Sequence, residues 1–297
     1  MMNAKFRALL RGALAGAACA GLAACGSNDL SQYQTFSSSG TALTNSIPAL
    51  YDAYYETAID ADAAQLILTR PALTADDRRA VFAQAHENLQ ARADIIGDLK
   101  RHARLLRAYF TSMDALARSD APTSISTSAG GVVDALNGLS PTIENATIGD
   151  VDVKSFVGPV VELIVQAKIS KALDARFRAD AAVIDRELNL HAAALEAVKA
   201  SIMADQEVIR QIDIVRNVRN AYASDGALPK DWAIRWRTSL SPSPEVEAID
   251  AAADAMKKVR TAYAALAEGR SGLDQTLLLL QDVSDVLALI EQIEGES

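Results

Sequence analysis

The chain is short of several residue types, and each shortage excludes a class of protein. Only two of its 297 residues are cysteines, Cys19 and Cys25, so the rest of the chain has neither a disulfide framework nor a thiol nucleophile. Aromatic residues make up 5% of the chain, and it contains only 8 prolines and 15 glycines. Alanine and leucine dominate instead, so the composition favours long helices over strands joined by turns.

Positive charge is also scarce. Lysine and arginine total 29 against 38 acidic residues, which gives a formal net charge of −9. The imbalance grows if Lys5, Arg7 and Arg11 are removed with a cleaved N-terminal segment. A chain of this charge repels phosphates, so we expect no nucleic-acid partner and no electrostatic attraction of the whole chain to an anionic membrane.

The apolar run near the N-terminus is shorter than the ~20 residues of a membrane-spanning helix. The segment MMNAKFRALLRG carries three positive charges, and the uncharged segment ALAGAACAGLAA follows it. A basic segment, a short apolar stretch and then small residues are the layout of a secretory signal. We therefore expect residues 1–24 to be a cleaved signal peptide.

This segment ends in Leu22-Ala23-Ala24-Cys25, which resembles the lipobox of bacterial lipoproteins. The resemblance implies cleavage before Cys25, a diacylglyceryl group on its thiol and acylation of the new amino group. Two or more acyl chains anchor a protein stably to a membrane. Gly26 stands where an aspartate can retain members of this family at the inner membrane, so in a Gram-negative host we expect the periplasmic face of the outer membrane. We expect no cofactor besides this lipid.

Beyond the cysteine, apolar residues recur alternately every three and four positions, which is the spacing of a helix packed along a seam. The first stripe is Tyr33, Phe36, Gly40, Leu43, Ile47, Leu50 and Tyr54. The second is Phe82, Ala85, Leu89, Arg92, Ile96, Leu99, Ala103, Leu106, Phe110 and Met113. The third is Phe177, Ala181, Ile184, Leu188, His191, Leu195, Val198 and Ile202. Two more comprise Val246, Ile249, Ala253, Met256, Tyr263 and Leu266, and then Leu273, Leu277, Leu280, Val283, Leu287 and Ile290.

These stripes predict one elongated, antiparallel, all-α bundle with long coiled-coil-like helices over residues 41–297. Residues 25–40 are open to two interpretations, an acylated tether or a frayed helix start, because SSSG lowers helix propensity. Residues 119–128 and 140–155 are expected to be loops, with a short helix between them. The longest helix is expected from residue 156 to 225, with a stutter at Asp205. One of these apolar seams could extend beyond its neighbours within the chain and be covered by a second copy, so homo-oligomerisation is left open.

Two of the three histidines follow an acidic residue by four positions. His102 follows Asp98 and His191 follows Glu187, which predicts pairing on a helix surface. The Glu-x-x-His spacing of di-iron bundles is absent, so no residue is assigned to a metal. His191 also lies on an apolar stripe, where a polar residue can fix helix register or respond to pH.

No motif of an enzyme is present. The chain has no Gly-x-Ser-x-Gly elbow, no phosphate-binding glycine-rich loop and no His-Glu-x-x-His sequence. We therefore assign no catalytic residue and expect a protein that is not an enzyme.

Both tryptophans lie four residues apart in DWAIRWRTSL, so Trp232 and Trp236 share one helix face and alternate with Arg235 and Arg237. One interpretation is a core anchor at the end of the bundle. The other is a partner-binding patch, since tryptophan and arginine are typical of interface hot spots.

Three hypotheses for function follow. The first is a lipid-anchored envelope protein that acts as a non-enzymatic scaffold or binds another envelope protein. The second is a membrane-active protein, because residues 129–165 resemble in layout the head of elongated α-helical pore-forming toxins. The third is a ligand- or metal-binding bundle.

Overall fold

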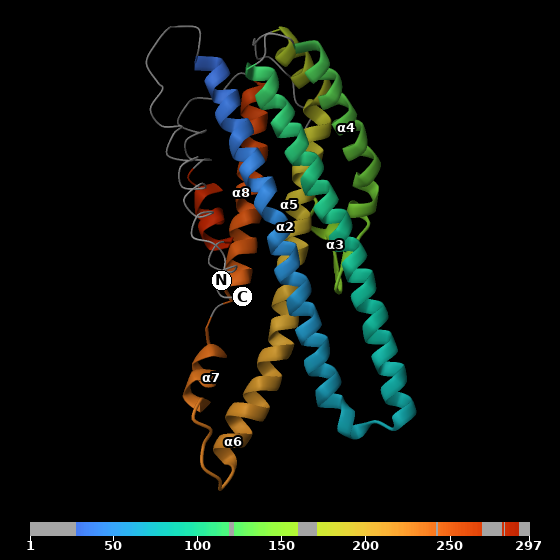
Figure 1. Ribbon diagram of the computed structural model, residues 1–297, viewed down its shortest axis with the longest axis vertical. Helices are drawn as coiled ribbons and strands as arrows, with labels where there is room; N and C mark the ends of the chain where they lie inside the picture. Colours follow the sequence, from blue (N-terminus) through green and yellow to red (C-terminus); the bar gives the residue numbers. More distant parts are fainter. Residues whose placement is uncertain are drawn as a thin grey trace, which may run out of the picture.

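The computed structural model of the protein describes residues 28–118, 122–159, 171–241, 243–268, 281 and 283–290 (Figure 1). Within these residues the protein is an elongated, antiparallel, all-α bundle, so the predicted fold class is confirmed. Whether the long helices form true coiled coils stays a prediction.

Helices α2 (Asn28–Thr69) and α3 (Ala75–Arg118) form a long hairpin, joined by the short 3-10 helix η2 (Arg70–Ala72). Residues 28–40 are helical, which favours the helix start over the tether. Thr74 caps the start of α3: its hydroxyl accepts the Asp77 backbone N–H at 3.3 Å and donates to the Asp77 carboxylate at 2.6 Å.

The next segment is more helical than the sequence predicted. Helix α4 (Pro122–Glu144) includes most of the expected loop 119–128 and the start of the expected loop 140–155. Propensity failed here because α4 buries Val133, Leu136 and Ile143 against its neighbours, and tertiary packing outweighs the local cost of serine, glycine and proline.

A two-stranded hairpin follows, formed by β1 (Thr147–Ile148) and β2 (Val151–Asp152), and then the 3-10 helix η3 (Val153–Phe156). Gly149 turns the hairpin with φ of 61°, and a Cβ atom there would lie 2.3 Å from the Ser201 hydroxyl. The hairpin backbone therefore packs directly on the long helix that comes next.

That helical path comprises α5 (Lys171–Asp213), the π-helical segment η4 (Ile214–Arg219) and α6 (Asn220–Ala223). At ~1.5 Å per residue, it is about 80 Å long. The stutter expected at Asp205 has no counterpart at that position, because α5 is regular α-helix as far as Asp213 and the π-helical segment begins only at Ile214. Phe156 ends η3 and does not open this path, and residues 160–170 lie outside the described residues.

Helix α7 (Trp232–Thr238) is short, and α8 (Pro244–Ala267) returns along the bundle. Ser243 caps α8 by accepting the Val246 backbone N–H at 3.3 Å. The final stripe is described only over 283–290, where Val283 and Ile290 are buried.

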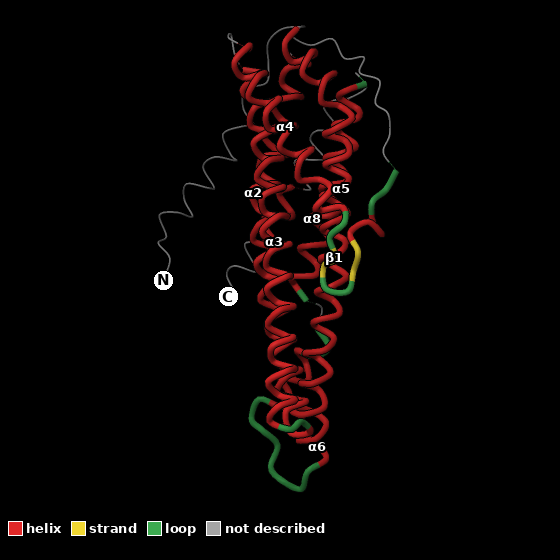
Figure 2. Tube along the Cα trace, turned by 90° about the vertical axis from the view of Figure 1, so that its right-hand side faces the viewer, coloured by secondary structure: helices red, strands yellow, loops and turns green. Residues whose placement is uncertain are grey.

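The bundle has two unlike halves (Figures 1 and 2). The proximal half contains the start of α2, and here α4 packs on α3 and α5 while α8 packs on α2 and α5. The distal half contains the continuations of α2, α3 and the α5 path, and it ends in the α2–α3 turn and the loop before α7. Figure 2 shows this half as a narrow extension of the bundle.

Whether a stripe residue is buried depends on the half of the bundle in which it lies. The α3 stripe is buried from Ile96 to Met113, but Phe82 is 61% exposed, and Ala85 and Leu89 are only partly covered. The prediction of one continuous buried stripe on α3 is therefore wrong in its first half. The reason is that α4 and α8 end before they reach this part of α3.

The few aromatic residues concentrate in the proximal core. Phe177 stacks on Tyr263 with ring centroids 5.0 Å apart, and Phe36 meets Phe110 edge to face at 5.5 Å. Gly40 belongs to this core because a Cβ atom there would lie 2.7 Å from the Phe110 ring. The glycine that weakens α2 locally therefore allows close approach of α2 and α3.

Candidate functional site

A buried polar network lies inside the proximal half. His102 from α3 and His191 from α5 are both fully buried, and their Nδ1 atoms are 3.0 Å apart. The other ring nitrogen of His102, Nε2, lies 2.9 Å from the Glu187 carboxylate on α5. The predicted surface pairing of these histidines is therefore wrong: Glu187 contacts His102 across the bundle, and Asp98 pairs with Arg101.

Two further helices complete the network. Ser140 on α4 donates to Glu187 at 2.6 Å, and Arg186 on α5 donates to the other carboxylate oxygen at 2.9 Å. On the opposite side, the Tyr51 hydroxyl on α2 lies 3.3 Å from His191 Nε2. The network thus joins α2, α3, α4 and α5 through side chains that sequence spacing alone does not connect.

Hydrogen-bond directions follow from the carboxylate at one end. Glu187 accepts the Nε2 proton of His102, so a neutral His102 accepts the Nδ1 proton of His191 at its own Nδ1. His191 Nε2 then accepts the Tyr51 hydroxyl proton. With these directions, each ring nitrogen of the two histidines has a hydrogen-bond partner.

Burial and hydrogen bonding set the charges in this network. Burial raises the pKa of Glu187, but hydrogen bonds from His102, Ser140 and Arg186 outweigh it, so the pKa falls below its ordinary value of 4.5. Burial, helped by the nearby His102, lowers the pKa of His191 well below 6.5. Burial also raises the pKa of Tyr51. At neutral pH Glu187 is ionised, whereas His191 and Tyr51 are neutral.

The histidine pair is not arranged as metal ligands. Its ring centroids are 5.2 Å apart and its Nδ1 atoms 3.0 Å apart, so the nitrogens lie on facing edges and point toward each other. Ligands of one ion must instead converge on a third point. In the described part of the chain, no group of three or more histidine, cysteine or acidic side chains could hold a metal ion.

A second polar contact joins the two charged residues that interrupt the apolar stripes of α3 and α5. Arg92 is the polar member of the α3 stripe and Asp205 ends the α5 stripe; their side chains form an ion pair at 2.7 Å. Beside it, the Tyr54 and Ser201 hydroxyls are 3.0 Å apart. Burial raises the pKa of Asp205, and Arg92 only partly opposes this shift. This pair stands where the buried proximal half meets the exposed distal half.

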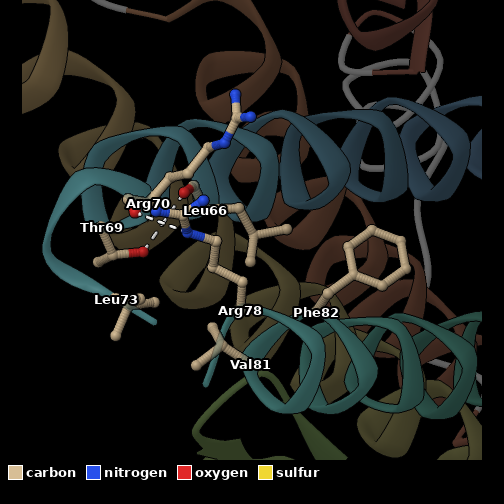
Figure 3. A pocket seen from close by; sticks show the side chains of 7 residues that line it. All are labelled: Leu66, Thr69, Arg70, Leu73, Arg78, Val81 and Phe82. Atoms are coloured by element: carbon tan, nitrogen blue, oxygen red, sulfur yellow. Dashed lines mark hydrogen bonds between the residues drawn. The ribbon is translucent and has the colours of Figure 1, made fainter. Parts of the chain in front are cut away.

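The distal end of the α2–α3 hairpin contains a small open cavity of about 150 Å³ (Figure 3). Leu66 and Leu73 line it from the α2 side, Val81 and Phe82 from α3. Arg78 closes one edge, since its Nε donates to the Arg70 carbonyl at 3.0 Å. A cavity of this size holds one apolar side chain, not a cofactor.

The other distal tip carries the predicted tryptophan–arginine patch. Trp232 Nε1 donates to the Val218 carbonyl at 2.9 Å, and Arg235 pairs with Asp231 at 2.6 Å. Trp236 is half exposed and Arg237 is exposed. The patch is therefore divided: Trp232 and Arg235 hold α7 in place, and Trp236 and Arg237 face outward.

The remaining predicted site residues cannot be placed. Leu22, Ala23, Ala24 and Cys25 lie outside the described residues. Across the described part of the chain, no helix combines the length and the apolar character needed to cross a membrane.

Comparison of the chain with protein-family models, curated proteins and solved structures finds no match.

Proposed function

We propose that the protein is a lipid-anchored component of a bacterial cell envelope that acts as a non-enzymatic scaffold and binds another envelope protein. The lipobox-like sequence ending in Cys25 supports the anchor. Helix α2 begins at Asn28, only three residues beyond Cys25, at the end of the bundle opposite the distal tips. An anchored bundle would thus carry its distal tips away from the acylated residue.

The absence of catalysis is part of this proposal. His102, His191 and Glu187 are fully buried, so they offer no atom to a substrate. Such a network is suited to fixing the register of four helices, because each polar group finds its partner in only one alignment. The histidines are therefore assigned to bundle architecture.

The observation that carries the partner-binding part is the unpaired apolar surface at the α2–α3 tip. Phe82 and Val81 line the small cavity and are exposed, and so is Ile67, which follows the lining residue Leu66 in α2. Between Ile59 and Leu89 acidic residues outnumber basic ones five to three, but the charged residues that line the cavity are Arg70 and Arg78. The fitting partner is a protein that inserts an apolar side chain at this cavity.

The alternative of a membrane-active head at residues 129–165 has less support. In its described part, the apolar side chains Ala129, Val133 and Leu136 are buried in the bundle. They are already engaged and would have to leave the core to meet lipid.

Two experiments test the proposal in cells. The Cys25→Ala variant should lose acylation and leave the membrane fraction, and a variant that stays membrane-bound contradicts the anchor. A photo-crosslinking amino acid at Phe82 should capture a defined envelope protein. The same probe at Arg107, which is exposed in the proximal half, is the matched control. Capture at neither position, or equally at both, contradicts the assigned partner surface.

A further inference from the structure

The α6–α7 tip has a charge opposite to that of the whole chain. Between Ile214 and Ser241, basic residues outnumber acidic ones five to two, whereas the full chain has 29 basic and 38 acidic residues. The net charge of the whole chain therefore does not reveal that one distal end is locally basic.

Most of this basic charge is not used inside the protein. Arg235 pairs with Asp231 at 2.6 Å and with Asp213 at 3.3 Å. The other four cations of the tip are exposed and form no ion pair with any residue in the described ranges: Arg216, Arg219, Lys230 and Arg237. They are available to an anionic partner.

Large apolar side chains are exposed among these cations. Tyr222 is 71% exposed, Ile234 64% and Leu240 67%, and Trp236 is half exposed. Trp232 holds these side chains from within: its ring stacks on Tyr222, with centroids 5.8 Å apart, and packs at a tilt against Trp236, with centroids 5.3 Å apart. The Trp232–Val218 hydrogen bond fixes this stack to the π-helical segment. The tip is thus a built aromatic surface and not a frayed end.

The shape of the tip favours a flat partner. The loop before α7 is the far extremity of the molecule and projects beyond the other helices (Figure 1). Aromatic, aliphatic and basic side chains gathered on a projecting surface are typical of protein segments that sit in the headgroup region of a membrane. We propose that the α6–α7 tip binds an anionic lipid surface, with Trp236 and Leu240 entering the headgroup region and the four unpaired cations contacting lipid phosphates.

The α2–α3 tip provides a natural contrast. It also exposes apolar residues, but its charge is acidic, so an anionic surface repels it. The two distal tips therefore differ in the partner that they can accept. If Cys25 is acylated, which rests on the function proposed above, the protein would contact lipid at both ends of its long axis.

Both tryptophans of the chain lie in α7, so tryptophan fluorescence reports on this tip alone. The full chain carrying Cys25→Ala is mixed with vesicles of phosphatidylcholine, with and without phosphatidylglycerol. We expect a blue-shifted emission only with the anionic vesicles, quenching by lipids brominated in the upper acyl chain, and reversal by salt. Because the N-terminal segment contains no tryptophan, lipid contact there does not produce these signals.

Substitution of the four cations, R216Q/R219Q/K230Q/R237Q, should weaken the apparent affinity by roughly 100-fold or more, since each cation near an anionic surface contributes about fivefold. Phe82→Ser, at the acidic tip, should leave the titration unchanged. Circular dichroism checks that each variant keeps its helix content. Emission that anionic vesicles leave unchanged overturns the proposal, as does a shift that persists in the four-cation variant. The acylation test of Cys25→Ala is independent of these results, so the two proposals can fail separately.

Discussion

Phe82 and Phe110 lie on the same predicted stripe of the same helix, yet one is 61% exposed and the other is fully buried. Phe110 lies in the proximal half, where α2 and α3 are packed so closely that Gly40 has no room for a Cβ atom. Phe82 lies in the first turns of α3, a part of the helix that extends beyond the ends of α4 and α8. The comparison teaches that an amphipathic pattern specifies a helix with one apolar face. Whether that face is buried in the core or exposed depends on which other helices pack against it.

The largest expected difference is between these two phenylalanines. Phe110→Ala should lower the free energy of unfolding by about 3–5 kcal/mol, because it removes a buried ring and leaves a cavity. Phe82→Ala should change it by less than about 0.5 kcal/mol, as is usual for exposed sites. Urea denaturation followed by circular dichroism measures both. Equal losses for the two variants would mean that the distal half is as well packed as the proximal half.

A smaller effect is expected from two glutamates of α5. Glu187→Ala removes the acceptor for His102 and Ser140 and should cost about 3 kcal/mol, since buried donors are left without partners. Glu207→Ala, in the exposed part of the helix, should be nearly neutral. If Glu187→Ala is also neutral in the same denaturation experiment, the network contributes nothing to stability.

Two helical glycines should respond with opposite signs. Gly40→Ala places a Cβ atom against the Phe110 ring and should cost about 1–3 kcal/mol through overpacking. Gly97→Ala meets no atom within 4 Å and should stabilise the protein by about 0.5–1 kcal/mol, because alanine is the better helix former. Thermal melts of the two variants provide the measurement. A stabilising Gly40→Ala would show that α2 and α3 are further apart than described.

The last effect concerns pH. His191 has a lowered pKa in the folded protein, so below its ordinary value of 6.5 the unfolded chain binds a proton that the folded chain does not. Stability should therefore fall as the pH drops from 7 to 5, by up to about 1.4 kcal/mol per pH unit below 6.5. His191→Gln should flatten this dependence, which urea denaturation at a series of pH values measures. A slope that survives His191→Gln must come from another group.

Glu187 adds to the same trend at lower pH. Its folded pKa is depressed, so its contribution is present above 4.5 and is lost as the pH falls through the lower, folded value. The denaturation midpoint of Glu187→Gln should consequently depend less on pH below 4.5 than that of the unaltered protein.

The sequence predicted well what depends on periodicity alone. The stripe positions Leu43, Leu188 and Ile249 are all fully buried, because a repeat of three and four places them on one face of a helix whatever lies opposite. The cap at Thr74 was predictable for a similar reason, since it depends on residues three positions apart. Features that depend only on residues close together in the sequence were therefore predicted correctly.

The errors arose where the outcome depends on another helix. Four-residue spacing suggested partners for His102 and His191 along their own helices, but the contacts run between helices. Arg92 and Asp205 each looked like a defect in a stripe, and they compensate one another. A charged residue interrupting one stripe, together with an opposite charge interrupting a second, was the only available signal for this pair.

The π-helical segment η4 has a mechanical consequence. A wide turn is a weak point for bending in an otherwise regular helix, so the long path from Lys171 to Ala223 is stiff only as far as Asp213. Glu187 and His191 belong to the stiff part, whereas Trp232 is hydrogen-bonded to Val218 within the compliant turn. A load on the distal tip is therefore expected to bend the path at this joint before it disturbs the polar network that aligns the helices.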